Sequence, residues 1–391
     1  MKKKLLSALL CVAMVASLVV GCGGKDDAAT SNDAASGDAT FKIGGIGPIT
    51  GGAAIYGQGV KNAAEIAVAE INAAGGINGY QVEFMWGDDE HDAEKAVNAY
   101  NDLKDQGMQM LLGTVTSTPC IAVADKTFAD NMFMLTPSGS AVDCVANDNA
   151  FRVCFSNPNQ GAASAQYIGE NGLASKVAVI YDSSDVYSAG IYETFAVEAA
   201  NQPFEIVAAE AFTADNKTDF SVQVQKAKDA GAELVFLPIY YQEASLILNE
   251  ADKQAYNAKF FGCDGLDGIL SVEGFDTALA EGVMLLTPFV ADEDSELTKN
   301  FVAKYDEQFG GVPNQFAADA YDGIYAIKAA AEKAGLTPDM SVSDMCDAMK
   351  TAMTEITIDG LTGAGITWTA EGEPSKAPKA MVIKDGAYTA M

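Results

Sequence analysis

The feature that most limits the fold of this chain is a regular alternation of short apolar runs with longer segments of helical spacing, which starts at Phe41. The run at 41–46 precedes a predicted helix at 57–74, where apolar residues recur every three or four positions before a Gly75-Gly76 stop. Further strands are predicted at 81–86, 108–112 and 132–135, with helices at 92–105 and from Pro119. This alternation predicts a parallel sheet covered by helices on both faces.

A second series of the same kind begins at 177. Strands are predicted at 177–181, 204–209, 234–238, 259–262, 283–286, 366–369 and 381–384. Helices are predicted at 187–200, 220–230, 243–254, 295–309, 316–333 and 342–353. Two series of similar length predict an α/β protein with two doubly wound lobes, each with its own core.

The loops that directly follow the predicted strands are expected to form the binding site, because ligands of open parallel sheets lie beyond the carboxyl ends of the strands. In the first lobe these loops are rich in hydroxyl groups. Ser117 stands two residues before Pro119, so we expect it to cap a helix whose first N–H groups face an anion. In the second lobe the loops carry tyrosines and Asp264, and an acid there suits an ammonium group. The two halves are complementary to an α-amino acid zwitterion.

Charge and rare residues exclude several other classes of function. The chain has 54 acidic against 24 basic residues and a formal charge of −30, which argues against nucleic acid as a partner. Arg152 is the single arginine and His91 the single histidine. We therefore expect no histidine-rich metal site and no arginine cluster for phosphate. A Ser-His-Asp catalytic triad would have to use His91. We interpret Arg152 as a structural pairing residue near a hinge. For His91, within the acidic stretch 88–92, a solvated loop is favoured over a metal site.

The first residues have the pattern of an export signal. Three lysines at 2–4 precede an apolar run at 5–20, and the order Leu-Val-Val-Gly-Cys at 18–22 resembles a bacterial lipobox. We therefore predict a signal peptide at 1–21, lipidation of Cys22, and a polar tether at 22–40. A retained anchor helix is the alternative, because the apolar run approaches the length that spans a membrane.

Five cysteines remain after the signal and the lipidated position, namely Cys120, Cys144, Cys154, Cys263 and Cys346. An exported protein can form disulfides. Cys144 and Cys154, ten residues apart across a polar loop, are the best candidate pair, and the spacing does not match a zinc site.

Taken in order, several phrases resemble the leucine/isoleucine/valine-binding family of substrate-binding proteins of ABC transporters. They are GPITGGAAIYGQGVKNAAEIAVAEINAAGGINGYQVE, LLGTVTST, MLTPSGS, VAVIYDSSDVYSAG and FFGCDG. The resemblance implies the type I periplasmic binding protein fold, with two lobes joined by three hinge crossovers and without catalysis, cofactor or metal. The expected partners are an amino acid and the permease subunits in the membrane, and the expected state is a monomer. The lobes are expected at 41–157 plus 288–356, and at 158–287 plus 357–391.

The resemblance also assigns roles to single positions. Ser117 and Ser140 match residues that bind the ligand carboxylate, and Ser138 matches a residue whose backbone faces both ends of the ligand. On the other lobe Asp264 matches an acid that pairs with the ammonium group. The aromatic candidates are Tyr187 and Tyr240, which close over the ligand, Tyr56 near its side chain, and Trp86. Some family members carry a disulfide between the loops around His91 and Thr116, which this chain cannot form.

Structural roles remain open for the same residues. Ser117 and Ser140 are compatible with helix capping alone, Tyr187 with helix-start packing, Tyr240 with core packing, and Asp264 with a local turn. A sensor of the same fold that binds amides, urea or small carboxylates is the alternative function. An enzyme is a weaker alternative, because no base is expected beside Ser117.

Overall fold

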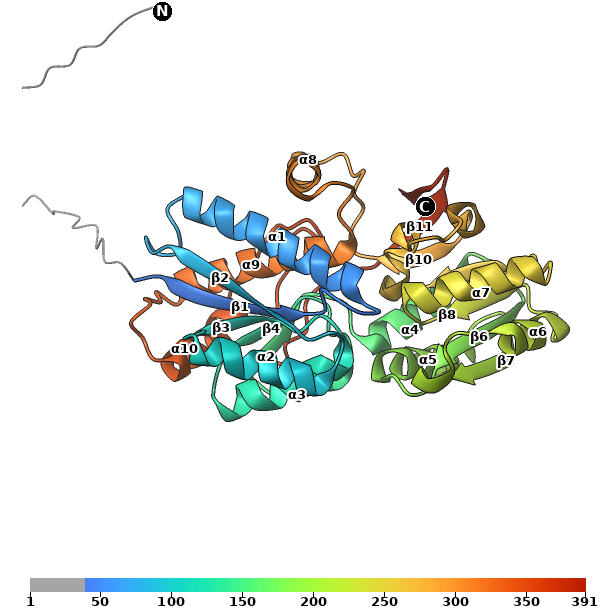
Figure 1. Cartoon of the computed structure of the whole chain (residues 1–391), viewed down its shortest axis with the longest axis horizontal. Coiled ribbons are helices and arrows are strands. Elements are labelled where there is room, and N and C mark those ends of the chain that lie inside the picture. The colour runs from blue at the N-terminus through green and yellow to red at the C-terminus, as the bar shows by residue number, and fades with distance from the viewer. Residues whose placement is uncertain (1–38) are drawn as a thin grey trace, which may run out of the picture. The chain divides into compact units, whose positions relative to one another are not determined.

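The computed structural model describes residues 39–391 (Figure 1), so the predicted signal peptide, Cys22 and nearly all of the tether lie outside the described residues. No helix within 39–391 combines the length and the apolar character needed to cross a membrane. The described residues contain two β-sheets with helices on both faces, which confirms the predicted α/β class and its parallel sheets.

The first sheet has five parallel strands in the order β2-β1-β3-β4-β5. Its strands are β1 (Phe41–Gly47), β2 (Val82–Asp88), β3 (Met110–Gly113), β4 (Met134–Thr136) and β5 (Ala150–Arg152). Successive side chains of a strand point to opposite faces of the sheet and therefore pack in different cores. Leu112 packs in the core that includes α1 and α9, and Leu111 packs in the core beside α2 and α3.

Six helices accompany this sheet: α1 (Ala54–Ala73), α2 (Ala93–Asp105), α3 (Ser117–Ala129), α8 (Glu296–Phe309), α9 (Gln315–Lys333) and α10 (Val342–Met353). The last three come from the far end of the sequence, yet α9 packs along α1 and touches β3 and β4. Figure 1 shows α9 and α10 in orange and red beside the blue and cyan elements.

The second sheet has seven strands in the order β12-β11-β10-β9-β8-β6-β7. Its strands are β6 (Lys176–Asp182), β7 (Glu205–Phe212), β8 (Leu234–Leu237), β9 (Lys259–Gly262), β10 (Met284–Thr287), β11 (Lys379–Lys384) and β12 (Ala387–Ala390). The first five run parallel, and β11 and β12 add an antiparallel edge. The helices here are α4 (Asn157–Glu170), α5 (Val186–Ala199), α6 (Ser221–Asp229) and α7 (Tyr241–Lys253).

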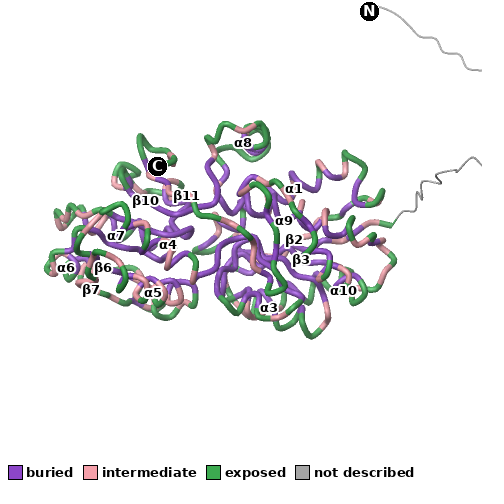
Figure 2. The backbone as a smooth tube through the Cα atoms, turned by 180° about the vertical axis from the view of Figure 1, so that it is seen from behind, coloured by how far each residue is buried: buried purple, intermediate pink, exposed green. Residues whose placement is uncertain are grey.

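The chain passes between the two groups of elements three times, after β5, after β10 and between α10 and β11. Buried backbone concentrates along the strands and at the junction, as Figure 2 shows in purple. Two strands and one α-helix were not predicted, β5, β12 and α4, and the strand predicted at 366–369 is reduced to isolated bridges through Ile366 and Trp368.

The structure does not contain the predicted bridge between Cys144 and Cys154. Both are buried free thiols, as are the other three cysteines of residues 39–391. Cys144 sits in the short 3₁₀ helix η1 (Val142–Val145), where its Sγ lies 3.7 Å from the carbonyl oxygen of Ser117. Cys144 therefore packs against the start of α3 instead of against Cys154.

Candidate functional site

The candidate site lies where the carboxyl ends of both sheets face each other. A cavity of about 10 Å³, room for about one water molecule, is enclosed by residues of both groups of elements. Its lining residues are Tyr56, Val115, Thr116, Ser117, Ser138, Tyr187, Tyr240, Asp264, Gly265 and Phe316. Six of the eight residues predicted to bind ligand are among them.

The first wall is formed by the loops that follow β3 and β4. Helix α3 begins at Ser117, and its N-cap residue is Thr116, so the expectation that Ser117 caps the helix is wrong. The Ser117 hydroxyl instead accepts a hydrogen bond from the N–H of Ala141 at 3.2 Å, which leaves its own hydrogen available to an acceptor. The Ser138 hydroxyl donates to the carbonyl of Val115 at 2.6 Å, which fastens the two loops together.

The opposite wall is centred on Asp264, at the start of the 3₁₀ helix η3 (Asp264–Leu266) that follows β9. Its carboxylate accepts hydrogen bonds from the Tyr187 hydroxyl at 2.6 Å and from the Gln160 amide at 2.8 Å. None of the ion pairs within residues 39–391 includes this buried carboxylate. Burial raises the pKa of Asp264 to about 6, and the two hydrogen bonds only partly oppose that rise.

Aromatic rings fill the space between the two walls. Tyr187 and Tyr240 stack with their ring centres 4.9 Å apart and an angle of 9° between the planes. Tyr56 meets Tyr240 edge to face at 5.7 Å and lies 4.2 Å from Phe316. The Tyr56 hydroxyl donates to the carbonyl of Gly265 at 2.5 Å, so a residue of α1 is bonded directly to η3 of the second sheet.

Close approach explains the glycine after Asp264. A Cβ at Gly265 would lie 2.6 Å from the Tyr187 hydroxyl oxygen and 2.7 Å from the carbonyl of Ile239. Only a residue without a side chain allows Tyr187 to reach both Asp264 and the Gly265 N–H, which donates to its hydroxyl at 2.9 Å.

Two of the predicted residues do not line the cavity. Ser140 is fully buried one residue before Ala141, and its hydroxyl has no hydrogen-bond partner in the structure. Trp86 packs its ring against Gly45 and Gly47 of β1, where a Cβ would lie 2.5 Å and 3.3 Å from ring atoms. The structure thus places Trp86 against the first sheet, and it is not among the residues that line the central cavity.

Arg152 fastens the loop that carries Ser138. It is fully buried at the end of β5 and donates to the carbonyls of Gly139 at 3.1 Å and Ala141 at 3.0 Å. Its Nε lies 3.3 Å from the carboxylate of Glu373 in the last crossover. These contacts give Arg152 a structural role, as its sequence context predicts, and none of them is in the central cavity.

His91 is not in a freely solvated loop. It is half-buried, its Nδ1 lies 2.8 Å from the Thr116 hydroxyl, and its ring meets Tyr240 edge to face at 5.5 Å. Burial and the charge of Lys217 lower the pKa of His91 to about 4. No group of three metal-ligating side chains occurs within residues 39–391. His91 therefore packs as a neutral ring at the edge of the site.

Sequence reasoning missed two polar residues that support Asp264. Gln160 lies on α4, and the Gln315 amide donates to the backbone carbonyl of Asp264 at 2.9 Å. The available signal for α4 was Ser156 followed by Pro158, because a serine N-cap with proline in the first turn marks a helix start. The contact of Gln315 joins segments 51 residues apart, and no local pattern indicates it.

This fold and site define a class of two-sheet binding protein with a cavity at the junction of the sheets. A family model for periplasmic binding proteins matches residues 40–387, and the chain belongs to that family. A relative from Brucella melitensis biotype 1, named Leu/Ile/Val-binding protein homolog 3, is 32% identical over 320 residues, which cover 80% of this chain and 84% of the relative.

Solved structures agree with this assignment. The branched-chain amino acid transporter substrate-binding protein LivJ of Streptococcus pneumoniae, in complex with isoleucine, has a TM-score of 0.81 at 26% identity and covers 90% of this chain and 98% of its own. A leucine-binding protein LivK from Thermotoga maritima has a TM-score of 0.80 at 24% identity, with the same two coverages, and supports the fold.

Proposed function

We propose that this protein is the extracytoplasmic substrate-binding component of an ABC importer and captures a branched-chain or related amino acid between its two halves. The observation that carries the proposal is the pairing of Ser117 and Ser138 on one wall with Asp264 on the other, across a single cavity. The names of the Brucella relative and of the isoleucine-bound neighbour support the same ligand class.

The two walls suit the two charges of an amino acid. Ser117 is the first residue of a helix of 13 residues, where backbone N–H groups and the helix dipole favour a carboxylate, and its hydroxyl adds a donor. Asp264 is a buried acid without a cationic partner, and an ammonium group would supply one. The tyrosines and Phe316 would surround an apolar side chain.

Binding requires the halves to separate. A cavity of about 10 Å³ cannot admit an amino acid, and the Tyr56–Gly265 hydrogen bond closes the gap. The three crossovers are the natural hinge, and the contacts that exist only in the closed state drive closure. The proposed N-terminal lobe comprises residues 41–157 plus 288–356, and the proposed C-terminal lobe comprises residues 158–287 plus 357–391.

The direct test is calorimetric titration of the mature protein with isoleucine, leucine and valine. We expect saturable binding of at least one at a one-to-one ratio, and the matching 2-hydroxy acid should bind far more weakly. Asp264→Ala should remove that preference for the amino acid. Ser117→Ala should lower affinity while it changes the unliganded free energy of unfolding by less than about 3 kcal/mol, the upper range for leaving the buried Ala141 N–H without its acceptor. Absence of binding by all three amino acids would refute the proposed ligand class.

We further propose that Cys22 anchors the protein by lipid at the outer face of the cell membrane, where a monomer meets the permease. Expression of Cys22→Ser in a bacterial host should release soluble protein or leave unprocessed precursor, as fractionation and blotting would show. Cys346→Ser, at a buried position of α10, is the matched control and should remain in the membrane fraction. Unchanged anchoring of Cys22→Ser would contradict lipidation.

A further inference from the structure

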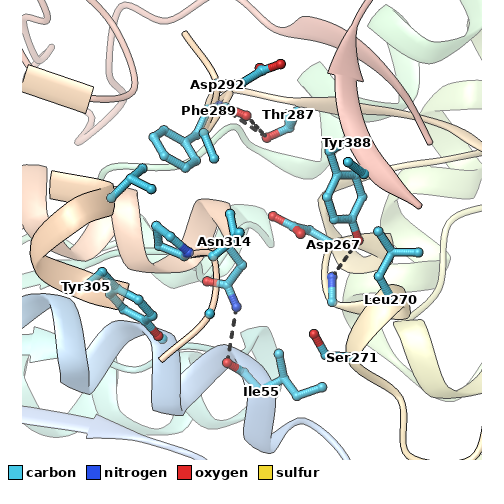
Figure 3. Close-up of a pocket in the computed structure, with 18 of the residues that line it drawn as sticks. Ile55, Asp267, Leu270, Ser271, Thr287, Phe289, Asp292, Tyr305, Asn314 and Tyr388 are labelled. Carbon is cyan, nitrogen blue, oxygen red and sulfur yellow. Dashed lines mark hydrogen bonds between the residues drawn. The ribbon is translucent and has the colours of Figure 1, made fainter. Parts of the chain in front are cut away.

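A second and much larger cavity lies beside the central one. It has a volume of about 640 Å³ and is lined by residues of both groups of elements (Figure 3). On one side are Ile55 at the start of α1, Tyr305 of α8 and Asn314 before α9. On the other side are Asp267 after η3 and Tyr388 of β12. Pockets for small organic ligands have volumes of this order.

Three short segments separate this cavity from the central one. Ile55 lines the large cavity and its neighbour Tyr56 the central one. In the same way Asp267 follows the segment that holds Asp264, and Asn314 precedes the segment that holds Phe316. The Tyr56–Gly265 hydrogen bond closes the partition, so the two cavities are distinct spaces with common walls.

The lining of the large cavity combines apolar and neutral polar side chains with two acids, the buried Asp267 and the exposed Asp292. Leu270, Leu285, Phe289 and Val302 contribute apolar surface, and no lysine, arginine or histidine lines the cavity. Asp267 is 7% exposed, and Figure 3 shows its carboxylate directed into the space between the walls that carry Asn314 and Tyr388.

The carboxylate of Asp267 is held in place but not neutralised. One oxygen accepts the N–H of Gln315 at 2.7 Å, and no ion pair of residues 39–391 includes Asp267. Burial raises the pKa of Asp267 to about 6, as expected for a buried acid without a cation. A cation in the cavity would provide the missing partner, whereas an anion would be repelled.

We propose that this cavity is a second binding site, which takes a small organic cation with an apolar body, such as a primary alkylamine. Its chemistry is opposite to that of the first wall of the central site, which favours a carboxylate. The proposal does not depend on the identity of the amino acid bound centrally.

The test compares three probes of equal chain length on the mature protein saturated with isoleucine, or with buffer alone if isoleucine does not bind. Hexylammonium, hexanol and hexanoate are titrated at pH 7.5 and followed by ligand-observed NMR. We expect hexylammonium to bind, and hexanoate to bind at least about tenfold more weakly because of charge repulsion. No hexylammonium binding at millimolar concentration, or equal binding of hexanoate, would overturn the proposal.

Two variants locate the bound amine. Asp267→Asn keeps an acceptor for the Gln315 N–H and should weaken hexylammonium about tenfold while leaving hexanol unchanged. Asp89→Asn is the matched control at another fully buried acid, which lines neither cavity, and it should leave hexylammonium binding intact. If saturating isoleucine displaced the bound hexylammonium, the amine would be in the central site and the proposal would fail. If Asp267→Asn does not fold, Ser271→Trp replaces it as the test variant. Ser271 is an exposed residue of the lining, and a tryptophan there should fill the cavity and block binding of all three probes.

Discussion

Asp264 is the residue at which structure and proposed function are most directly linked. An unliganded carboxyl with a pKa near 6 is mostly protonated at pH 5 and mostly charged at pH 7. An ammonium group pairs with the charged form, so binding at pH 5 must first remove a proton. Amino acid affinity should therefore fall about tenfold from pH 7 to pH 5, because the charged fraction of the Asp264 carboxyl falls about tenfold over that range.

Calorimetry with isoleucine across pH 5–8 measures this slope. The Asp264→Asn variant should bind isoleucine weakly at every pH, and its affinity should no longer depend on pH. Asp185→Asn is a matched control, because burial also raises the pKa of Asp185 to about 6, yet Asp185 does not line the central cavity. It caps α5 by accepting the N–H of Tyr187, and asparagine can do the same. A flat profile for the unaltered protein would contradict the assigned partner of the ammonium group.

At the scale of elements, the sequence predicts the positions of the loops at the ends of the strands, but it does not reveal every helix. The loops after β3, β4 and β9 were identified from sequence because apolar strands end abruptly in hydroxyl, glycine and acidic residues. Helix α4 was missed because its buried face includes Gln160, Gly161 and Ser164, which give no apolar periodicity. Trp86 is not among the residues that line the central cavity, and its role in ligand binding stays a prediction, because a large aromatic residue near a strand end has the same pattern whether it packs on the sheet or faces a ligand.

The loop at 137–142 is held by Arg152, which stands at the end of β5, and β5 is an element that the sequence did not reveal. We expect Arg152→Met to lower the free energy of unfolding by about 3–5 kcal/mol, because it leaves buried carbonyls unpaired, and to weaken amino acid binding as Ser138 loses its position. Urea denaturation and calorimetry measure the two effects. Lys253→Met, which removes a cation that is 71% exposed, should change stability by less than about 0.5 kcal/mol. Equal stability of the two variants would show that Arg152 does not hold this loop.

At the scale of the whole molecule, closure rests on contacts that join the two groups of elements. The hydroxyl of Tyr56 is such a contact, because it bonds α1 to the backbone of Gly265. A hydrogen bond contributes about 1 kcal/mol net, which corresponds to about a fivefold change in an equilibrium constant. Tyr56→Phe should therefore destabilise the closed state relative to the open state by about that factor.

The kinetics of ligand binding distinguish this effect from a general loss of stability. Because the contact forms only on closure, Tyr56→Phe should raise the dissociation rate of the amino acid about fivefold and should not lower the association rate, since binding begins with the open state. Tyr100→Phe is the matched control, since its hydroxyl bonds to Asp130 at 2.8 Å within one group of elements. That control should lower thermal stability without any change in dissociation rate. If stopped-flow measurements gave the same dissociation rate for Tyr56→Phe and the unaltered protein, closure would have to be held by the tyrosine stack and the crossovers alone.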